Sequence, residues 1–241
     1  MAYQAVFRRY EMKYLLTEDQ YRSVLEAMVP YMSADKYGLT TIRNIYFDTN
    51  DFRLIRRSTE KPLYKEKLRL RSYGAPKPGD PVFVELKKKF DGVVYKRRVS
   101  MVTEDALDWI CRGIKPGEDP QIVREIDYFK SFYGALSPTV FLGYDRVAYY
   151  AADGSDFRVT FDRNIRFRQE NIRLDGSSEG QALLPEGMVL MEVKSIGGMP
   201  LWMTGTLTKL GVFKTSFSKY GTAYEKYIFP NQEVFANGSA L

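Results

Sequence analysis

Three stretches decide the fold of this chain: LYKEKLRLRSY at 63–73, PVFVELKKKF at 81–90 and VVYKRRVSMV at 93–102. In each of them charged residues alternate with apolar ones, and alternate residues of a β-strand share a face. The turn signals between the stretches, the second of them Asp91-Gly92, predict antiparallel hairpins. Each strand should therefore carry one cationic and one apolar face. The charged members are Lys67, Arg69 and Arg71; Glu85, Lys87 and Lys89; and Lys96 with Arg98.

The positive charge of the chain comes from this region. Residues 53–98 hold 15 Lys and Arg against five Asp and Glu, whereas the rest of the chain holds 21 basic and 25 acidic residues. Buried Lys and Arg without counterions are very costly. The faces therefore either look into bulk water or surround a bound anion, and the pattern alone leaves both open.

Composition narrows the chemistry further. The 241 residues contain no histidine and one cysteine, Cys111, which excludes His-based nucleophilic catalysis and zinc clusters. The apolar pattern of Leu107, Ile110 and Ile114 predicts that Cys111 is a core residue of a helix. Carboxylates, lysines, arginines and hydroxyls remain, a set that suits phosphoryl groups and hard metals such as magnesium or manganese.

Length and composition allow one large β-rich domain or two small ones, and we expect a single α+β domain over residues 1–241. No apolar run approaches the roughly 18 residues of a membrane span, and the first residues do not have the form of a signal peptide. We therefore expect a cytoplasmic protein without a membrane segment. No pattern indicates an obligate protein partner.

The rest of the chain reads as strands separated by a few helices. Thr17 and Gln20 form a capping box before a helical stripe that ends at Met28. The Gly-, Ser- and acid-rich segment 173–186 predicts a surface loop. Further strands are expected at 5–16, 40–48, 139–150, 157–168 and 188–195, and helical segments at 50–57, 103–113, 119–132, 200–210 and 219–227.

The later strands repeat the charged face. Arg146 lies within one of them, Arg158 and Asp162 share a face with Thr160 between them, and Glu192 alternates with Lys194. The first strand adds Glu11 and Lys13. About eight such strands predict a closed antiparallel barrel with a narrow cationic lumen, which would hold a polyanion together with a metal ion.

Six segments in this order resemble the triphosphate tunnel metalloenzymes, and within them the polyphosphate polymerase (VTC) domain of the vacuolar transporter chaperone complex and its bacterial relatives. The segments are Ile45-Tyr46-Phe47-Asp48-Thr49-Asn50-Asp51-Phe52, Leu68-Arg69-Leu70-Arg71, Val84-Glu85-Leu86-Lys87, Tyr95-Lys96-Arg97-Arg98, Glu192-Val193-Lys194 and Phe217-Ser218-Lys219-Tyr220.

The resemblance implies an eight-stranded tunnel that binds ATP and polyphosphate and uses Mn²⁺ or Mg²⁺ to transfer a γ-phosphoryl group. It implies a catalytic role for Arg69, Arg71, Lys87 and Glu192, and metal binding by Glu192, with Glu11 and Glu85 as further candidates. The implied phosphate ligands are Lys13, Lys96, Arg98, Arg146, Arg158, Lys194, Ser218 and Lys219.

Some positions depart from the family or leave alternatives open. The first strand reads Arg9-Tyr10-Glu11-Met12-Lys13, where the hydrolytic branch has Glu-x-Glu-x-Lys, and this favours the polymerase branch. Ser216 stands where the polymerases commonly have a lysine, which Lys214 could replace. Glu85 is either a metal ligand or the partner of Lys87 or Arg69, and Asp48 and Asp51 are interpreted as turn and cap residues.

Two other functions are compatible with a cationic tunnel. The first is a triphosphatase that uses water as acceptor, and the second is a module that binds polyphosphate without catalysis. Nucleic acid is not expected, because the alternates to Arg69, Arg71 and Lys87 are leucines, which offer no stacking surface for bases.

Overall fold

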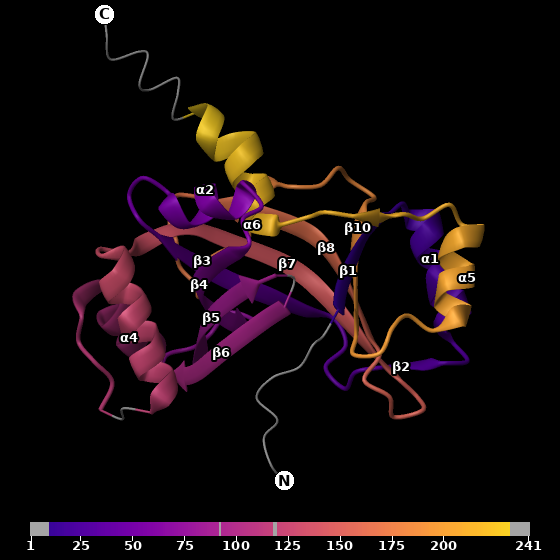
Figure 1. Ribbon diagram of the computed structural model, residues 1–241, viewed down its shortest axis with the longest axis horizontal. Coiled ribbons are helices and arrows are strands. Elements are labelled where there is room, and N and C mark those ends of the chain that lie inside the picture. Colours follow the sequence, from indigo (N-terminus) through magenta and orange to yellow (C-terminus); the bar gives the residue numbers. More distant parts are fainter. Residues whose placement is uncertain (1–9, 92, 118–119, 232–241) are drawn as a thin grey trace, which may run out of the picture. The chain divides into compact units, whose positions relative to one another are not determined.

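The computed structural model describes residues 10–91, 93–117 and 120–231 (Figure 1). The chain groups into two compact units. The first comprises Met1–Ile42, Tyr144–Ile165 and Leu184–Phe217, and the second comprises Arg43–Gly143, Arg166–Leu183 and Ser218–Leu241. Strands β3 (Thr40–Asp48), β7 (Ser137–Ala151) and β8 (Arg158–Arg168) have residues in both units.

The first unit is built on β1 (Tyr10–Leu16) and β10 (Val189–Ser195), which pair antiparallel with Lys13 opposite Glu192. On its other edge β10 pairs with β8, and β1 also pairs with the short β11 (Lys214–Thr215). The three-residue β2 (Met32–Ala34) pairs with the end of β7. Alternate residues of β1, β8 and β10 therefore share one charged face.

Two helices lie side by side on the first unit, α1 (Glu18–Met28) and α5 (Leu201–Lys209) (Figure 1). Val24 and Met28 of α1 and Met203 and Leu207 of α5 are buried in one core. The apolar faces of β1, β8 and β10 complete that core, through Tyr14, Leu16, Val159, Phe161, Val189, Met191 and Val193. The opposite strand faces remain for the charged residues.

The second unit contains the hairpins that the opening stretches predict. Strands β4 (Tyr64–Tyr73), β5 (Val82–Phe90) and β6 (Val93–Met101) pair antiparallel, with Arg69 opposite Glu85 and Glu85 opposite Arg98. The two-residue β9 (Gln181–Ala182) pairs with the end of β8. The apolar face of β4 and β5 is fully buried, as predicted, and consists of Leu68, Leu70, Val84 and Leu86.

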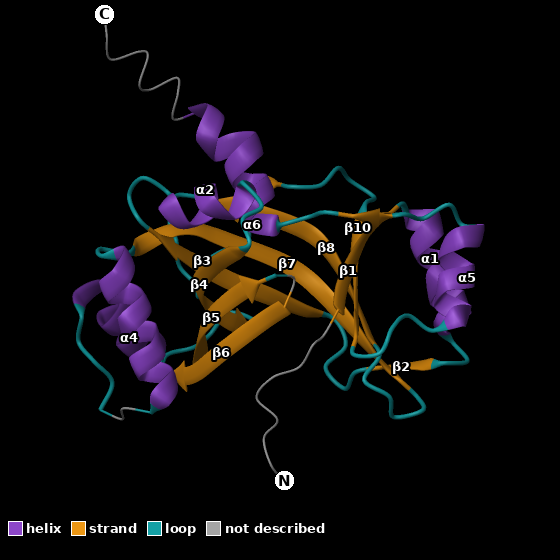
Figure 2. Cartoon of the chain, viewed as in Figure 1, coloured by secondary structure: helices purple, strands orange, loops and turns teal. Residues whose placement is uncertain are grey.

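Helices of the second unit pack on that apolar face (Figure 2). The helix α4 (Gln121–Tyr133) contributes Val123, Ile126 and Phe129 and contacts β6. Trp109 and Ile110 come from a π-helical turn, η1 (Asp108–Arg112), which follows α3 (Thr103–Leu107). The remaining helices are α2 (Arg53–Thr59), α6 (Lys219–Ala223) and the π-helical η2 (Tyr224–Ile228).

The predicted class, an antiparallel sheet with flanking helices, is confirmed. The sheet differs from the expected barrel in strand number and closure. It has eleven strands among the described residues, in the order β11-β1-β10-β8-β7-β3-β4-β5-β6, with β2 on β7 and β9 on β8. This path is open, since no pairing of described residues joins β11 to β6. The single domain over 1–241 stays a prediction.

Most predicted boundaries agree with the structure to within a few residues, and the capping box is present: Thr17 Oγ1 accepts from Gln20 N, and Gln20 Oε1 accepts from Thr17 N. The prediction for Cys111 is wrong, because its side chain is exposed. The wider π turn at 108–112 directs Trp109 and Ile110 inward and turns the next residue outward. The predictions for residues 5–9, Gly92 and Asp119 lie outside the described residues.

Within the described ranges, each helix is too short or too polar to span a bilayer.

Candidate functional site

The second unit holds a cluster of cations around one carboxylate, which we call the Glu85 cluster (Glu85, Arg69, Arg71, Lys96 and Arg98). Glu85 is fully buried. Its Oε2 accepts from Arg69 Nε at 2.8 Å, and Arg71 Nε lies 3.8 Å from the same oxygen. Its Oε1 contacts Lys96 Nζ at 2.6 Å and accepts from Arg98 Nε at 2.7 Å. One negative charge on β5 is therefore shared by four cations from the two neighbouring strands, β4 and β6.

Polar neighbours fix the directions of the guanidinium groups. Arg69 NH1 donates to the Tyr46 hydroxyl at 3.1 Å, and Arg98 NH2 donates to the Tyr73 hydroxyl at 2.9 Å. Arg71 Nε donates to Asn44 Oδ1 at 2.9 Å. Because Asn44 Nδ2 donates in turn to a backbone carbonyl of β7, its amide orientation is determined. The arginines are thus held in place before any ligand binds.

The surplus of cations shows in the pKa values. Burial would raise the pKa of Glu85, but Arg69, Arg71 and Lys96 outweigh burial and hold it well below its usual range. Burial together with the charges of Arg69 and Arg71 lowers the pKa of Lys96 to about 7, although Glu85 opposes this change. Burial also raises the pKa of Tyr46, but the two arginines lower it by more. An anion entering the cluster would relieve the repulsion.

Other predicted ligands lie on or near the same strand face. Lys87 is directly opposite Lys67 on β4 and Lys96 on β6, so the three lysines share the face of Glu85. Lys67 Nζ donates to Ser218 Oγ at 3.0 Å, which places the first residue of the Ser218-Lys219 pair beside β4. The charge of Lys219 contributes to the lowered pKa of Tyr46.

The first unit holds a second group, which we call the Glu192 cluster (Glu192, Glu11, Lys13, Arg146, Arg158, Thr160, Asp162 and Lys194). Arg146 donates to both oxygens of Asp162, at 2.5 and 2.6 Å, and to Glu192 Oε2 at 3.1 Å. Lys13 Nζ lies 3.7 Å from Glu192 Oε1, and Lys194 Nζ lies 3.9 Å from Oε2. Four cations and three carboxylates therefore meet on one strand face.

Burial makes these pairs strong. Asp162 is fully buried and Glu192 is 6% exposed. Burial lowers the pKa of Arg146, but the charges of Asp162, Tyr144 and Glu192 outweigh it and raise the pKa well above its ordinary value. Arg158 is opposite Lys194, and its guanidinium lies 4.6 Å from the centre of the Tyr150 ring. Arg146 is thus the fixed centre of the cluster.

Sequence reasoning did not assign a role to Thr160 or Asp162. Thr160 is directly opposite Glu192, fully buried, and its Oγ1 has no hydrogen-bond partner among the described residues. The sequence signal that could have identified Thr160 was its position between Arg158 and Asp162, with which it shares a strand face. Asn44 and Tyr46 of the Glu85 cluster were also missed as arginine partners, although Tyr46 belongs to a quoted motif.

Glu11 and Glu192 are the carboxylates of this cluster that would hold a divalent cation. Within the described residues, no three Asp, Glu, His or Cys side chains form a metal site. Glu11 and Glu192 both contact Lys13, at 3.4 and 3.7 Å, so two carboxylates lie near one ammonium group. Magnesium is often held by one or two carboxylates plus phosphate oxygens. A metal role for Glu85 would require a cation to leave its carboxylate.

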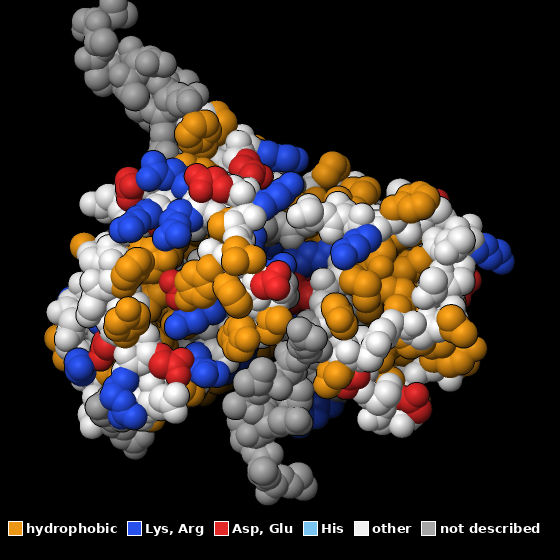
Figure 3. All heavy atoms as spheres, viewed as in Figure 1, with side chains coloured by type: hydrophobic (Ala, Val, Ile, Leu, Met, Phe, Trp, Pro, Cys, Tyr) orange, Lys and Arg blue, Asp and Glu red, His pale blue; other side chains and the backbone are white. Residues whose placement is uncertain are grey.

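The interpretation of Asp48 as a cap residue is confirmed, and Asp51 lies in the turn before α2. Asp48 accepts from the backbone N–H groups of Leu54 and Ile55 at the start of α2 and from the Tyr220 hydroxyl. Asp51 accepts from Thr49 Oγ1 and from Arg56, at 2.6 and 2.8 Å. Basic and acidic side chains are mixed around α2 (Figure 3). The arginines of α2 therefore form a solvated surface of mixed charge.

Comparison with one solved structure supports the fold. A putative adenylate cyclase (bh2851) from Bacillus halodurans is similar with a TM-score of 0.50 at 14% identity, over 88% of this chain and 95% of that one. PH1819 from Pyrococcus horikoshii gives a TM-score of 0.45 at 15% identity, over 93% and 98%. A search of curated proteins gives no significant sequence match.

The family model of the VTC domain matches residues 8–228. That span includes every strand of both clusters and nearly the whole chain. The chain therefore belongs to the VTC domain family.

Proposed function

We propose that the protein is a metal-dependent polyphosphate polymerase, which transfers the γ-phosphoryl group of ATP to a growing polyphosphate chain. The observation that carries the proposal is the excess of cations in the Glu85 cluster, where four side chains share one carboxylate. A polyanion supplies the missing charge. Membership of the VTC domain family supports a role in binding triphosphate groups.

Phosphoryl transfer needs positioning and charge neutralisation more than a nucleophilic side chain. In the proposed step a terminal oxygen of the acceptor chain forms a bond to the γ-phosphorus. The bond from that phosphorus to the β–γ bridging oxygen breaks, and ADP leaves with the electron pair. Arg69, Arg71 and Lys87 would bind the phosphate oxygens, and the tyrosine and asparagine contacts would keep the guanidinium groups aligned.

Glu192, with Glu11 beside it, would supply the carboxylate oxygens for Mn²⁺ or Mg²⁺. The bound cation would neutralise charge on the phosphoryl oxygens. Lys13, Arg146, Arg158 and Lys194 would offset the charge of the remaining phosphates.

The state of the carboxylates favours a phosphate acceptor over water. Hydrolysis requires a positioned water and a basic group. In the Glu192 cluster, Asp162 accepts from Arg146, Glu192 contacts Arg146 and two lysines, and Glu11 contacts Lys13. Each of these three carboxylates is thus engaged by at least one cation. A triphosphatase is the alternative that the test below must exclude.

The test incubates the protein with ATP and Mn²⁺ and measures ADP, free phosphate and polymer length on a gel. We expect ADP and a phosphate ladder with little free phosphate, and we expect Glu192→Gln to abolish both. Glu186→Gln, an exposed carboxylate of the same unit, is the matched control and should keep full activity. Free phosphate equal to ADP without a ladder would instead show a triphosphatase. Binding of tripolyphosphate without turnover would show a binding module.

A further inference from the structure

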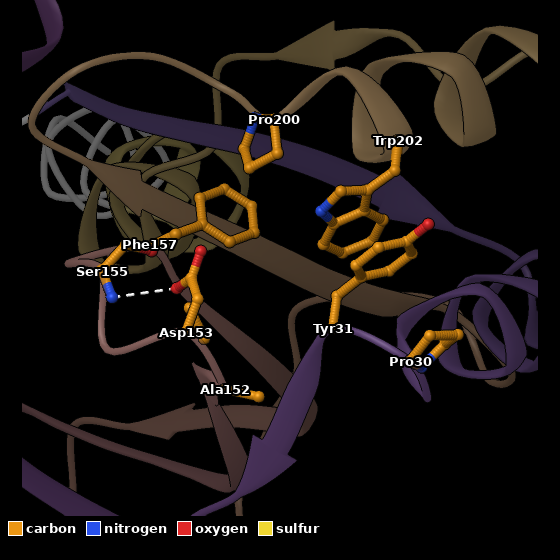
Figure 4. A pocket seen from close by; sticks show the side chains of 9 residues that line it. Pro30, Tyr31, Ala152, Asp153, Ser155, Phe157, Pro200 and Trp202 are labelled. Atoms are coloured by element: carbon orange, nitrogen blue, oxygen red, sulfur yellow. Dashed lines mark hydrogen bonds between the residues drawn. The ribbon is translucent and has the colours of Figure 1, made fainter.

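The first unit contains a small pocket away from the charged strand face, formed by three loops (Figure 4). Pro30 and Tyr31 follow α1, Pro200 and Trp202 begin α5, and residues 151–157 form the turn between β7 and β8. Its volume is about 250 Å³. This is below the usual range for drug-sized ligands, so the pocket suits one side chain or a small ion.

The walls of the pocket are aromatic. The rings of Tyr31 and Trp202 stack with centroids 4.5 Å apart and planes 9° apart, and Phe157 meets Trp202 edge to face at 6.0 Å. Figure 4 shows Phe157 and Pro200 on one side and the stacked pair on the other. Tyr31 is 45% exposed, which leaves costly apolar surface at the opening.

Asp153 is the one charged residue that lines the pocket. Its Oδ1 accepts from Ser155 N at 2.9 Å, and this hydrogen bond lowers the pKa of the carboxyl group. The carboxylate is therefore ionised at neutral pH. Aromatic rings around one carboxylate attract an organic cation, by cation–π attraction and by direct ion pairing.

The geometry favours an ammonium group over a guanidinium. A guanidinium that binds both oxygens of Asp153 would have to share Oδ1 with Ser155 N, which donates to it at 2.9 Å. An ammonium is a point charge that needs one oxygen, and its alkyl stem can pack against rings. The net charge of +6 repels cations at long range, so recognition must come from these contacts.

We propose that the pocket formed by Tyr31, Phe157, Trp202, Pro30, Pro200 and Asp153 binds an alkylammonium group. The group belongs either to a free amine or to a lysine side chain of a partner. This site is separate in chemistry from the proposed polymerase, since it selects a cation and uses no residue of either charged cluster.

Tryptophan fluorescence tests the proposal, because Trp109 is fully buried and Trp202 lines the pocket. n-Pentylammonium should change the emission in a saturable way, and the uncharged 1-pentanol should not. A short peptide with a central lysine, compared with the same peptide acetylated on Nε, distinguishes the sources. Tighter binding of the lysine peptide than of n-pentylammonium would indicate a protein partner, and the reverse a free amine.

Two variants make the test specific. Asp153→Asn keeps an acceptor for Ser155 N, and Tyr31→Ala removes the outer ring; each should weaken n-pentylammonium binding by about tenfold or more. Glu186→Gln, exposed and not part of the lining, should bind like the original protein. Unchanged far-ultraviolet circular dichroism checks that the variants fold. Equal binding of 1-pentanol, an unaffected Asp153→Asn or no saturable change would overturn the proposal.

Discussion

Individual side chains explain why an array of lysines and arginines is stable on a strand face. Glu85 accepts from or contacts four cations, and Arg146 joins Asp162 to Glu192. The alternating letters predict which residues share a face, and they left open whether Glu85 pairs with Arg69. They could not predict Asn44 and Tyr46 as partners, because these contacts depend on the packing of β3 beside β4 within the second unit.

The pKa of Lys96 leads to a pH dependence. A phosphate ligand favours the charged form of Lys96 and so raises its pKa from about 7. Above that pH, binding must take up a proton, and affinity for tripolyphosphate should fall as pH rises from 6 to about 9. Isothermal titration calorimetry in buffers of different ionisation enthalpy measures the proton uptake.

Lys96→Arg is the matched control for this prediction, because an arginine stays charged at every pH used. It should lose this decrease, and a rise in affinity with pH would then report the deprotonation of tripolyphosphate, which adds negative charge to the ligand. The same pH dependence in both proteins would exclude Lys96 as the titrating group.

Removal of the Glu85 charge should destabilise the protein without ligand. In Glu85→Gln the four cations lose their shared counterion, and the amide brings two donors toward guanidinium donors. Because three of the four cations are partly exposed, we expect a loss of about 2–4 kcal/mol in unfolding free energy. Urea denaturation measures it, with the exposed Glu179→Gln of the same unit as control. Equal urea midpoints for the original protein and Glu85→Gln would show that Glu85 does not hold the cluster together.

At the scale of elements, the predictable parts were those with long periodicity. Strand β3 was predicted with the observed boundaries, and α1 follows its capping box. The strands β2, β9 and β11 have two or three residues and carry no alternation, so their sequences could not indicate them. The π turn at 108–112 changed the direction of Cys111 because helical periodicity assumes 3.6 residues per turn.

The capping box of α1 gives a test at this scale. Thr17→Ala removes the acceptor for Gln20 N, and it should lower the unfolding free energy by about 1 kcal/mol. Amide hydrogen exchange should quicken in the first turn of α1. Thr204→Ala in α5, an exposed threonine without a capping role, should have a smaller effect. Equal losses would mean that the cap contributes nothing specific.

At the scale of the whole molecule, charge balance links folding to ligand. The chain carries +6, and residues 53–98 alone carry an excess of ten positive charges. The alternation of charged and apolar residues predicts a closed barrel. The number of strands and the closure of the sheet depend instead on short strand pairings that the sequence does not indicate.

Tripolyphosphate should therefore stabilise the folded protein. At 100 times its dissociation constant it should add about 2.7 kcal/mol, visible as a rise in melting temperature. An increase of sodium chloride from about 50 to 500 mM should reduce this rise in melting temperature, since salt screens the attraction between tripolyphosphate and the cations. A rise that is independent of salt would indicate that charge does not drive binding.

Glu85 also bears on which anions the protein can distinguish. Its carboxylate already pairs with the cations. An incoming anion must therefore compete with a carboxylate that belongs to the protein and cannot diffuse away. A monovalent anion brings no more charge than Glu85 and gains little by displacing it. A triphosphate, with about four negative charges, outweighs it. The buried carboxylate would thus set a valence threshold and keep chloride, which is abundant in any cell, from filling the cluster.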